Sequence, residues 1–327
     1  MGTENVMNGR AFEFALANAV ADHLKKSRFE FVSDSEYGIR AKAFESRTAE
    51  AQSMFTKAAM LPMETLFRLE PALGHASDIN DRLFIRFNND ASGRDGDVRD
   101  LVLFRKNSKG AITWEIGLSA KNNHDAVKHS RLSETNDFAK SWLNVPCSNE
   151  YWTSVRGIFG KIDEWRNDGM EKWNEVESLK EKLIYVPLLK AFRKEVMRIY
   201  ECDHKATVEA LISYLIGKFP FYKVIKYDGN GMVVMQAFNL VPGLGETYAG
   251  TRPDCRPKKI PYPSRIVEFE FADKKPGTMK DTMTIIMDHG WQIDFRIHSG
   301  DGNLVKTAKF DTRLTGNPPI LFTQHLF

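Results

Sequence analysis

With 327 residues, of which 42% are apolar, the chain can bury the core of one large domain or of two ordinary ones. Lys and Arg number 46 against 43 Asp and Glu, and the resulting formal charge of +3 is too small to identify or exclude a polyanionic partner. The three cysteines, Cys147, Cys202 and Cys255, are widely spaced, which argues against a disulfide framework and favours a reducing compartment. There is no signal-peptide pattern and no apolar run near the roughly 20 residues of a membrane helix, so we expect a cytoplasmic protein without a membrane segment.

The first predicted elements are a helix and, further on, a β-hairpin. Asn8 is a candidate N-cap, and the apolar residues behind it recur at helical spacing: Phe12, Leu16, Val20 and Leu24. Residues 98–104 and 112–121 read as two strands joined by a turn at 107–110. A further helix is expected to begin near Asn123 or His124.

The middle of the chain is typical of helices and the last third is typical of strands. Pro187 suits a first helical position, and a second helix over 208–216 is expected to end at Gly217. Hairpins are predicted over 222–238 and 283–298, with a proline-rich loop at 242–263 between them. We therefore expect an α/β fold of the α+β kind, with a mixed sheet flanked by helices in 1–148, a helical region in 149–218 and a β-rich region in 219–327.

Asp100 and Lys121 form the pattern that indicates a catalytic site. Residues two apart on a strand share a face, so Glu115, Gly117, Ser119 and Lys121 point one way and Trp114, Ile116, Leu118 and Ala120 point the other. A turn at 109–110 would place Asp100 opposite Ser119, beside Lys121. A carboxylate and a lysine around a hydrated Mg²⁺ are typical of phosphodiester hydrolysis, although Asp before an apolar strand and a later Lys also occur in many unrelated proteins.

The expected second acid is missing, because the acid-x-lysine pattern reads Ser119-Ala120-Lys121. Glu134 is ranked first as its replacement, since a helix after the strand could return it to the site. Glu13, on the N-terminal helix, is a second contributor to the metal site. Glu115 is on the correct face but about 13 Å along the strand at ~3.3 Å per residue, too far for direct ligation without a bulge.

Basic and polar residues follow the candidate site. On the expected helix, His124, Lys128 and Arg131 would share one face near Asn123, suited to DNA phosphates or simply to solvent. The Asn-Asn-His run at 122–124 also has a faint likeness to the histidine–asparagine–histidine nucleases, but no second histidine or zinc-ligand pair supports it.

Several segments closely resemble the HaeIII family of type II restriction endonucleases. The most specific is Ser-Ala-Lys-Asn-Asn-His at 119–124, within a longer run at 114–133, and 98–102 agrees as well. The other agreeing segments are distributed over nearly the whole chain: 8–13, 137–148, 221–223, 238–239, 290–298 and 309–311.

The resemblance implies a PD-(D/E)XK nuclease fold, Mg²⁺ as cofactor, and double-stranded DNA as substrate, cut within the palindrome GGCC. Arg99 replaces the proline of the general pattern, and Ser119 replaces its acid. Our hypothesis for the mechanism is that Asp100 ligates Mg²⁺, Lys121 orients or activates the water, Glu134 or Glu13 completes the metal sphere, and Lys128 and Arg131 bind nearby phosphates.

Base recognition is expected in the region 219–327. Guanine offers O6 and N7 to basic side chains, and the candidates are Arg252, Arg256, Arg296 and His298. A palindrome is most simply met by a homodimer, although a monomer could cut one strand at a time, and the expected functional partner is a cytosine methyltransferase. Two alternatives stay open: a repair or structure-specific nuclease of the same fold, and a DNA-binding protein whose catalytic site has decayed.

Overall fold

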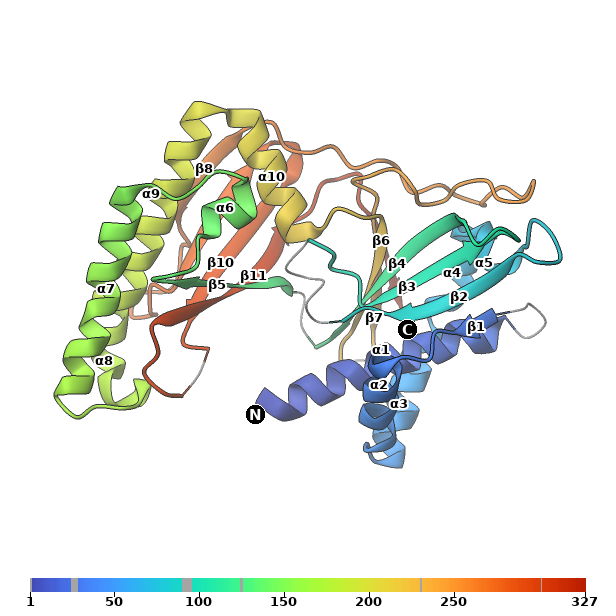
Figure 1. Cartoon of the computed structure of the whole chain (residues 1–327), viewed down its shortest axis with the longest axis horizontal. Helices are drawn as coiled ribbons and strands as arrows, with labels where there is room; N and C mark the ends of the chain where they lie inside the picture. Colours follow the sequence, from blue (N-terminus) through green and yellow to red (C-terminus); the bar gives the residue numbers. More distant parts are fainter. Residues whose placement is uncertain (1, 25–28, 90–95, 124–125, 230, 301) are drawn as a thin grey trace. The chain divides into compact units, whose positions relative to one another are not determined.

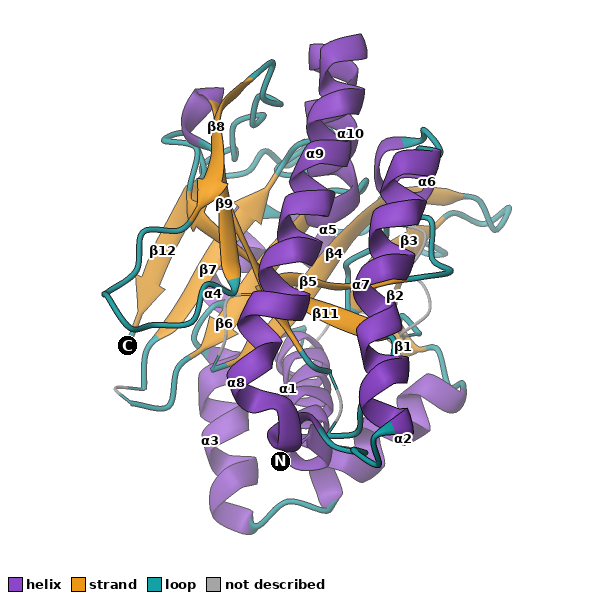
Figure 2. Cartoon of the chain, turned by 90° about the vertical axis from the view of Figure 1, so that its left-hand side faces the viewer, coloured by secondary structure: helices purple, strands orange, loops and turns teal. Residues whose placement is uncertain are grey.

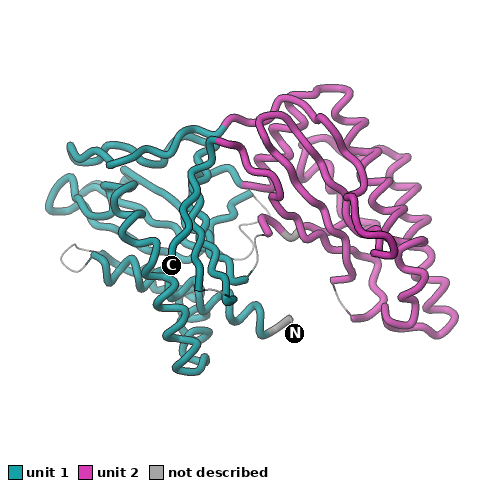
Figure 3. Tube along the Cα trace, turned by 180° about the vertical axis from the view of Figure 1, so that it is seen from behind, with its two compact units in different colours: residues 1–125, 217–260, 320–327 teal, residues 126–216, 261–319 magenta. Residues whose placement is uncertain are grey.

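A computed structural model describes residues 2–24, 29–89, 96–123, 126–229, 231–300 and 302–327. The chain forms two compact units (Figure 3). Unit 1 comprises Met1–Asp125, Gly217–Ile260 and Ile320–Phe327, and unit 2 comprises Ala126–Ile216 and Pro261–Pro319. Unit 2 is therefore inserted into the sequence of unit 1 in two pieces. None of the helices in the described part of the chain is long and apolar enough to span a membrane.

Unit 1 is built on a mixed sheet in the order β1-β2-β3-β4-β6-β7-β12 (Figure 1). Its strands are β1 (Phe29–Phe31), β2 (Arg82–Phe87), β3 (Leu101–Lys106), β4 (Ile112–Asn122), β6 (Phe221–Lys226), β7 (Val233–Phe238) and β12 (Phe322–Leu326). Its helices are α1 (Gly2–His23), α2 (Ser35–Glu45), α3 (Ala49–Met60), α4 (Met63–Leu69) and α5 (Pro71–Gly74). The pairs β1–β2 and β4–β6 are parallel and the others are antiparallel, which confirms the expected mixed sheet and α+β class.

Helix α1 covers one face of this sheet. Phe12 and Leu16 share a core with Ile116 and Leu118 of β4, so the predicted helical stripe is confirmed. The predicted cap is wrong, because α1 begins at Gly2 and Asn8 lies inside it. The segment ahead of Asn8 contains no proline, and Glu4 in the first turn suits the positive end of the helix dipole, so the helix extends toward the N-terminus.

The predicted hairpin is confirmed in β3 and β4. Leu101 pairs with Leu118, and the register runs to Arg105 opposite Trp114 before a shift near the turn. At the turn, Gly110 has a φ of 79°, which a glycine adopts without a steric penalty. This register, continued by one residue, places Asp100 opposite Ser119.

Unit 2 is an antiparallel sheet with helices on one face, in the order β5-β11-β10-β9-β8. Its strands are β5 (Ala126–Ser133), β8 (Ile266–Phe271), β9 (Thr282–Met287), β10 (Gln292–His298) and β11 (Thr307–Gly316). Its helices are α6 (Phe138–Leu143), α7 (Asn149–Asn167), the 3-10 helix η2 (Trp173–Val176), α8 (Glu177–Lys180), the π-helix η3 (Glu181–Tyr185), α9 (Val186–Cys202), α10 (His204–Ile216) and the 3-10 helix η4 (Asp288–Gly290). Helices α7 and α9 lie side by side in Figure 2.

The two long helices predicted in the middle region are confirmed. Pro187 lies in the first turn of α9, whose apolar stripe is buried, and α10 ends just before Gly217. Phe192 of α9 packs against Phe295 and Phe310 of the sheet, with ring centroids 5.2 and 5.1 Å apart. An aromatic core of this kind fixes the helix layer to one face of the sheet.

The helix predicted after Lys121 is wrong, because residues 126–133 form strand β5. It pairs with β11, which places Lys128 opposite Thr312 and Arg131 opposite Lys309. Residues three apart on a strand point to opposite faces, so Lys128 and Arg131 do not form one cationic surface. The spacing of polar residues carries no information on this distant strand partner. The third member of the predicted face, His124, lies outside the described residues.

The strands predicted in 219–327 are confirmed, and they are divided between the two sheets. The β6–β7 hairpin and β12 belong to unit 1, whereas the β9–β10 hairpin belongs to unit 2. Residues 242–263 form a loop with one isolated bridge between Tyr248 and Thr251.

Candidate active site

The carboxylate of Asp100 and the ammonium of Lys121 lie beside each other, where β3 begins and β4 ends. Asp100 Oδ2 lies 3.2 Å from Lys121 Nζ, and it also accepts hydrogen bonds from Ser119 Oγ at 3.0 Å and from Ala120 N at 2.7 Å. The Lys121 and Asp100 side chains are 18% and 23% exposed, so both are held in place and still accessible to solvent. The juxtaposition expected from the hairpin register is confirmed.

Glu13 is the second carboxylate that faces this pair. Burial raises the pKa of Glu13 to about 8, and the negative charge of Asp100 adds to the increase, whereas Arg40 and Lys121 act in the opposite direction. Arg40 Nε of α2 donates to Glu13 Oε2 at 2.9 Å. Glu13 is therefore in electrostatic contact with both Asp100 and Lys121, and it is held by a buried guanidinium.

Arg40 is a site residue that the sequence did not reveal. It is 2% exposed and donates to Glu13, Glu36 and the backbone oxygen of Asn88. The Asn88 N–H in turn donates to Asp100 O at 3.0 Å, so Arg40 connects α1, α2 and the backbone beside Asp100. The only sequence signal is a charged residue within the apolar spacing of a helix.

Glu134 and Glu115 have other partners. Glu134 lies in unit 2, where Lys306 Nζ is 3.4 Å from its carboxylate and 2.5 Å from Asp163. Glu115 lies in unit 1 and forms an ion pair with Arg99 at 2.6 Å. Among the described residues of unit 1, the structure thus groups Glu13, but not Glu115, with Asp100 and Lys121 through an electrostatic interaction, whereas the ion pair of Glu134 lies within unit 2.

Arg99 occupies the face of β4 between Glu115 and Ser119. Its guanidinium is held by Asp97 and Glu115 and lies over the Phe219 ring, 4.0 Å from the centroid. Gly117 provides the room, because a Cβ at this position would overlap the Arg99 side chain. Arg99 therefore supports the strand that carries Ser119 and Lys121.

The residues at the site fit a magnesium ion. Mg²⁺ commonly takes one or two carboxylates and fills its other positions with water or phosphate oxygens. Asp100 and Glu13 supply two carboxylates. Burial and, after it, the negative charge of Asp100 raise the pKa of Glu13, and a divalent cation held by both carboxylates would offset their repulsion. Among the described residues, no three His, Cys, Asp or Glu side chains gather as a metal site.

The polar residues expected to contact DNA are dispersed. Asn123 secures the turn after β6, where its Oδ1 accepts from Asp228 N at 2.7 Å. In unit 2, Lys128 Nζ donates to Tyr214 O on the helix-covered side, whereas Arg131 is exposed. Arg296 pairs with Asp281 at 3.2 Å, and His298 Nε2 lies 3.5 Å from Asp311 Oδ1.

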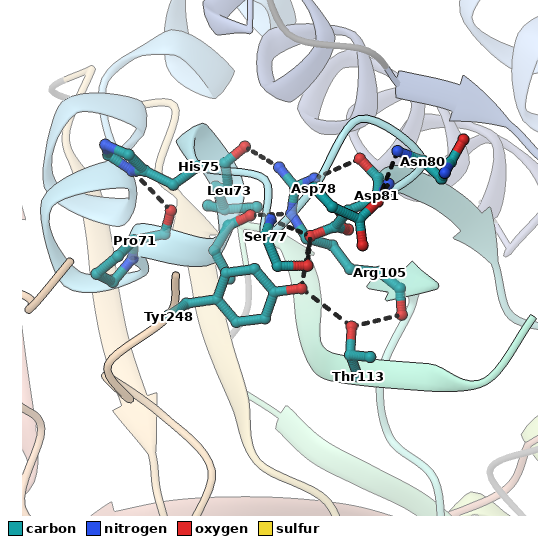
Figure 4. A network of polar contacts seen from close by, with 11 residues as sticks. Pro71, Leu73, His75, Ser77, Asp78, Asn80, Asp81, Arg105, Thr113 and Tyr248 are labelled. Carbon is teal, nitrogen blue, oxygen red and sulfur yellow. Dashed lines mark hydrogen bonds and ion pairs between the residues drawn. The ribbon is translucent and has the colours of Figure 1, made fainter. Parts of the chain in front are cut away.

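Arg252 and Arg256 lie exposed in the proline-rich loop, which a polar network ties to the sheet of unit 1 (Figure 4). Tyr248 OH donates to Asp81 Oδ2 at 2.7 Å and lies 3.0 Å from Thr113 Oγ1 of β4. Buried Arg105 donates to Leu73 O and to Asp81, behind the tyrosine. This network holds Tyr248 in place, just ahead of Arg252 and Arg256 in the loop.

The comparisons with known proteins identify the family of the chain. Residues 9–318 match the family model described as HaeIII restriction endonuclease. The chain is also 34% identical over 319 residues to the type II restriction enzyme HaeIII of Haemophilus aegyptius, covering 97% of this chain and 96% of that protein. No solved structure gives a significant match. These matches define a nuclease of the restriction endonuclease class. Within that class, the chain belongs to the HaeIII restriction endonuclease family.

Proposed function

We propose that the protein is a Mg²⁺-dependent type II restriction endonuclease that cleaves double-stranded DNA within GGCC. The observation that carries the proposal is the convergence of Asp100, Lys121 and Glu13 in unit 1. A PD-(D/E)XK core is supported by α1 packed on the antiparallel β2-β3-β4 strands, followed by the parallel strand β6.

The proposed roles follow from the contacts. Asp100 and Glu13 would hold the ion, and Ser119 and the Ala120 N–H fix the Asp100 carboxylate by donating to it. A bound Mg²⁺ would lower the pKa of a water and neutralise charge on the phosphate in the transition state. Lys121 orients the attacking water or takes its proton, and Arg40 holds Glu13 in position.

Glu13 replaces Glu134 as the first choice for the acid absent from position 119. Glu13 senses the charges of Asp100 and Lys121, whereas Glu134 forms its ion pair with Lys306 in unit 2. In this proposal the second acid of the site therefore lies on the N-terminal helix α1 instead of at position 119 on strand β4.

The specificity and partners are proposed from the family. The relative carries the name type II restriction enzyme HaeIII, and the resemblance implies GGCC for its family. A palindromic site favours a homodimer, and a restriction enzyme requires a cognate methyltransferase, here one that modifies cytosine, to protect the host DNA.

A digest of plasmid DNA by the purified protein tests the proposal. With Mg²⁺ we expect discrete fragments whose sequenced ends all fall within GGCC, and with EDTA we expect intact plasmid. Ends without a common sequence would identify a structure-specific or repair nuclease instead. Binding without cleavage at any Mg²⁺ concentration would identify a catalytically decayed DNA-binding protein.

A further inference from the structure

The five-stranded sheet of unit 2 has one apolar and one charged face. Along β10 and β11 buried residues alternate with partly exposed ones. The buried set, which includes Phe295 and Phe310, packs against the helix layer. The other face carries Asp294, Arg296, His298, Lys309, Asp311 and Arg313.

Strand register brings three basic side chains of this face into one row across β5, β11 and β10. Lys309 pairs with Arg131 on one side and with His298 on the other. Like charges directly opposite each other on neighbouring strands destabilise a sheet, so the Arg131–Lys309 pair has a cost in the free protein. Within the described residues neither Arg131 nor Lys309 forms an ion pair, whereas His298 Nε2 lies 3.5 Å from Asp311 Oδ1.

Gly300 lies beside the two cationic side chains. A Cβ at position 300 would lie 3.3 Å from Lys309 Cβ, 3.6 Å from Lys309 Cδ and 3.8 Å from Arg131 Nη1. The Lys309 stem and the Arg131 guanidinium therefore both lie close to the same exposed glycine, which has no side chain to cover them. A phosphate group bound on the solvent side of this pair would have two cationic neighbours, and it would offset their mutual repulsion.

We propose that Arg131 and Lys309 form a contact for the DNA phosphate backbone in unit 2. The inference rests on the proposed function and deepens it, because it assigns these residues to sequence-independent binding rather than to base recognition. Backbone contacts position the protein on the duplex and carry no sequence information themselves. Lys309, which the sequence did not single out, lies at the centre of the row.

The test measures binding of labelled duplexes, with and without GGCC, by Arg131→Gln and Lys309→Gln variants in EDTA between 50 and 250 mM NaCl. Each variant should bind both duplexes more weakly by the same factor. The slope of log affinity against log salt concentration should become shallower by about 0.9 for each phosphate that the variant no longer neutralises. Lys205→Gln is the matched control, since it removes one charge from a side chain of unit 2 that is 73% exposed on α10, and it should behave as the wild type.

The outcomes separate this inference from the proposed function. Wild-type cleavage combined with unchanged binding by both variants would overturn the phosphate contact alone. A weakening confined to the GGCC duplex would also overturn it, because the row would then recognise bases. Wild-type protein that neither binds nor cleaves DNA would overturn the proposed function and this inference together. Equal thermal denaturation midpoints for all four proteins would show that folding does not account for the differences.

Discussion

Arg40 Nε lies 2.9 Å from Glu13 Oε2, and this buried ion pair joins α2 to α1 directly beside Asp100. Burial and the charge of Asp100 disfavour the charged form of Glu13. The Arg40 guanidinium is therefore the main group that stabilises the Glu13 carboxylate. Arg40 is therefore a positioning residue for the proposed ion site.

Replacing Arg40 with Gln should raise the Mg²⁺ concentration that cleavage requires. Loss of the guanidinium raises the pKa of Glu13 further and frees its side chain, and removal of groups that orient metal ligands typically costs about 10- to 100-fold in metal affinity or activity. The measurement is the Mg²⁺ concentration at which the single-turnover rate is half-maximal. Arg40→Lys, which retains the charge, should show a smaller shift; an unchanged Mg²⁺ requirement in Arg40→Gln would refute the positioning role.

Glu13→Gln and Glu134→Gln distinguish the two acids. Glu13→Gln should slow single-turnover cleavage on the order of 100-fold or more, since a direct ligand should cost at least as much as a group that only orients one. Glu134→Gln should cut at close to the wild-type rate, because Lys306 retains Asp163 as a partner. The reverse ranking would restore Glu134 as the acid of the site.

Gly117→Ala should destabilise unit 1. The added Cβ would overlap the Arg99 side chain, which cannot move without disturbing its contacts with Asp97 and Glu115. Overpacking of this kind typically costs roughly 1–3 kcal/mol and is measured by denaturant unfolding. Gly157→Ala is the control: it lies within α7 with nothing near its Cβ position, and it should be neutral or stabilising by up to about 1 kcal/mol. Equal stabilities of the two variants would contradict the packing argument.

Glu70 should make stability decrease as the pH rises through neutrality. Its carboxyl is fully buried, accepts from Tyr222 OH and Gly245 N, and burial raises its pKa to about 7. The protonated form is favoured in the folded state, so the stability is fully present below pH 4.5 and is lost as the pH rises toward 7. The difference between these two pKa values corresponds to about 3 kcal/mol at most.

Glu70→Gln should remove this part of the pH dependence. The difference in free energy of unfolding between the variant and the wild type should grow in favour of the variant from pH 4.5 to pH 7. Denaturant unfolding at a series of pH values across this range measures it. If the free energies of unfolding of the two proteins change with pH in parallel, Glu70 has the same pKa in the folded and the unfolded state, and the prediction is wrong.

The sequence predicted the part of the site that lies in one hairpin. The turn at 107–110 sets the register of β3 and β4, and the alternation of apolar side chains sets which face is buried, so the meeting of Asp100 and Lys121 follows from local information. The apolar stripes of α1 and α9 could likewise be predicted from the spacing of apolar residues within each helix.

The sequence could not rank Glu13 above Glu134, because their positions depend on contacts between distant elements. The rotation of α1 about its axis is fixed by packing on the sheet and by Arg40 from α2. Residues 126–133 form a strand because β11, far along the chain, pairs with them. The spacing of polar residues in 126–133 does not indicate which strand will pair with them. For the same reason, the sequence did not predict that the later strands are divided between two sheets.

The most direct test of the account is the single-turnover cleavage rate of Asp100→Asn, with DNA affinity measured on the same preparation. The substitution leaves an oxygen that can accept from Ser119 and Ala120, while it removes the charge that holds the cation and pairs with Lys121. We predict that cleavage falls below detection at any Mg²⁺ concentration while the duplex is still bound. Cleavage by Asp100→Asn at the wild-type rate would contradict the assignment of Asp100 and Lys121 as the centre of the active site.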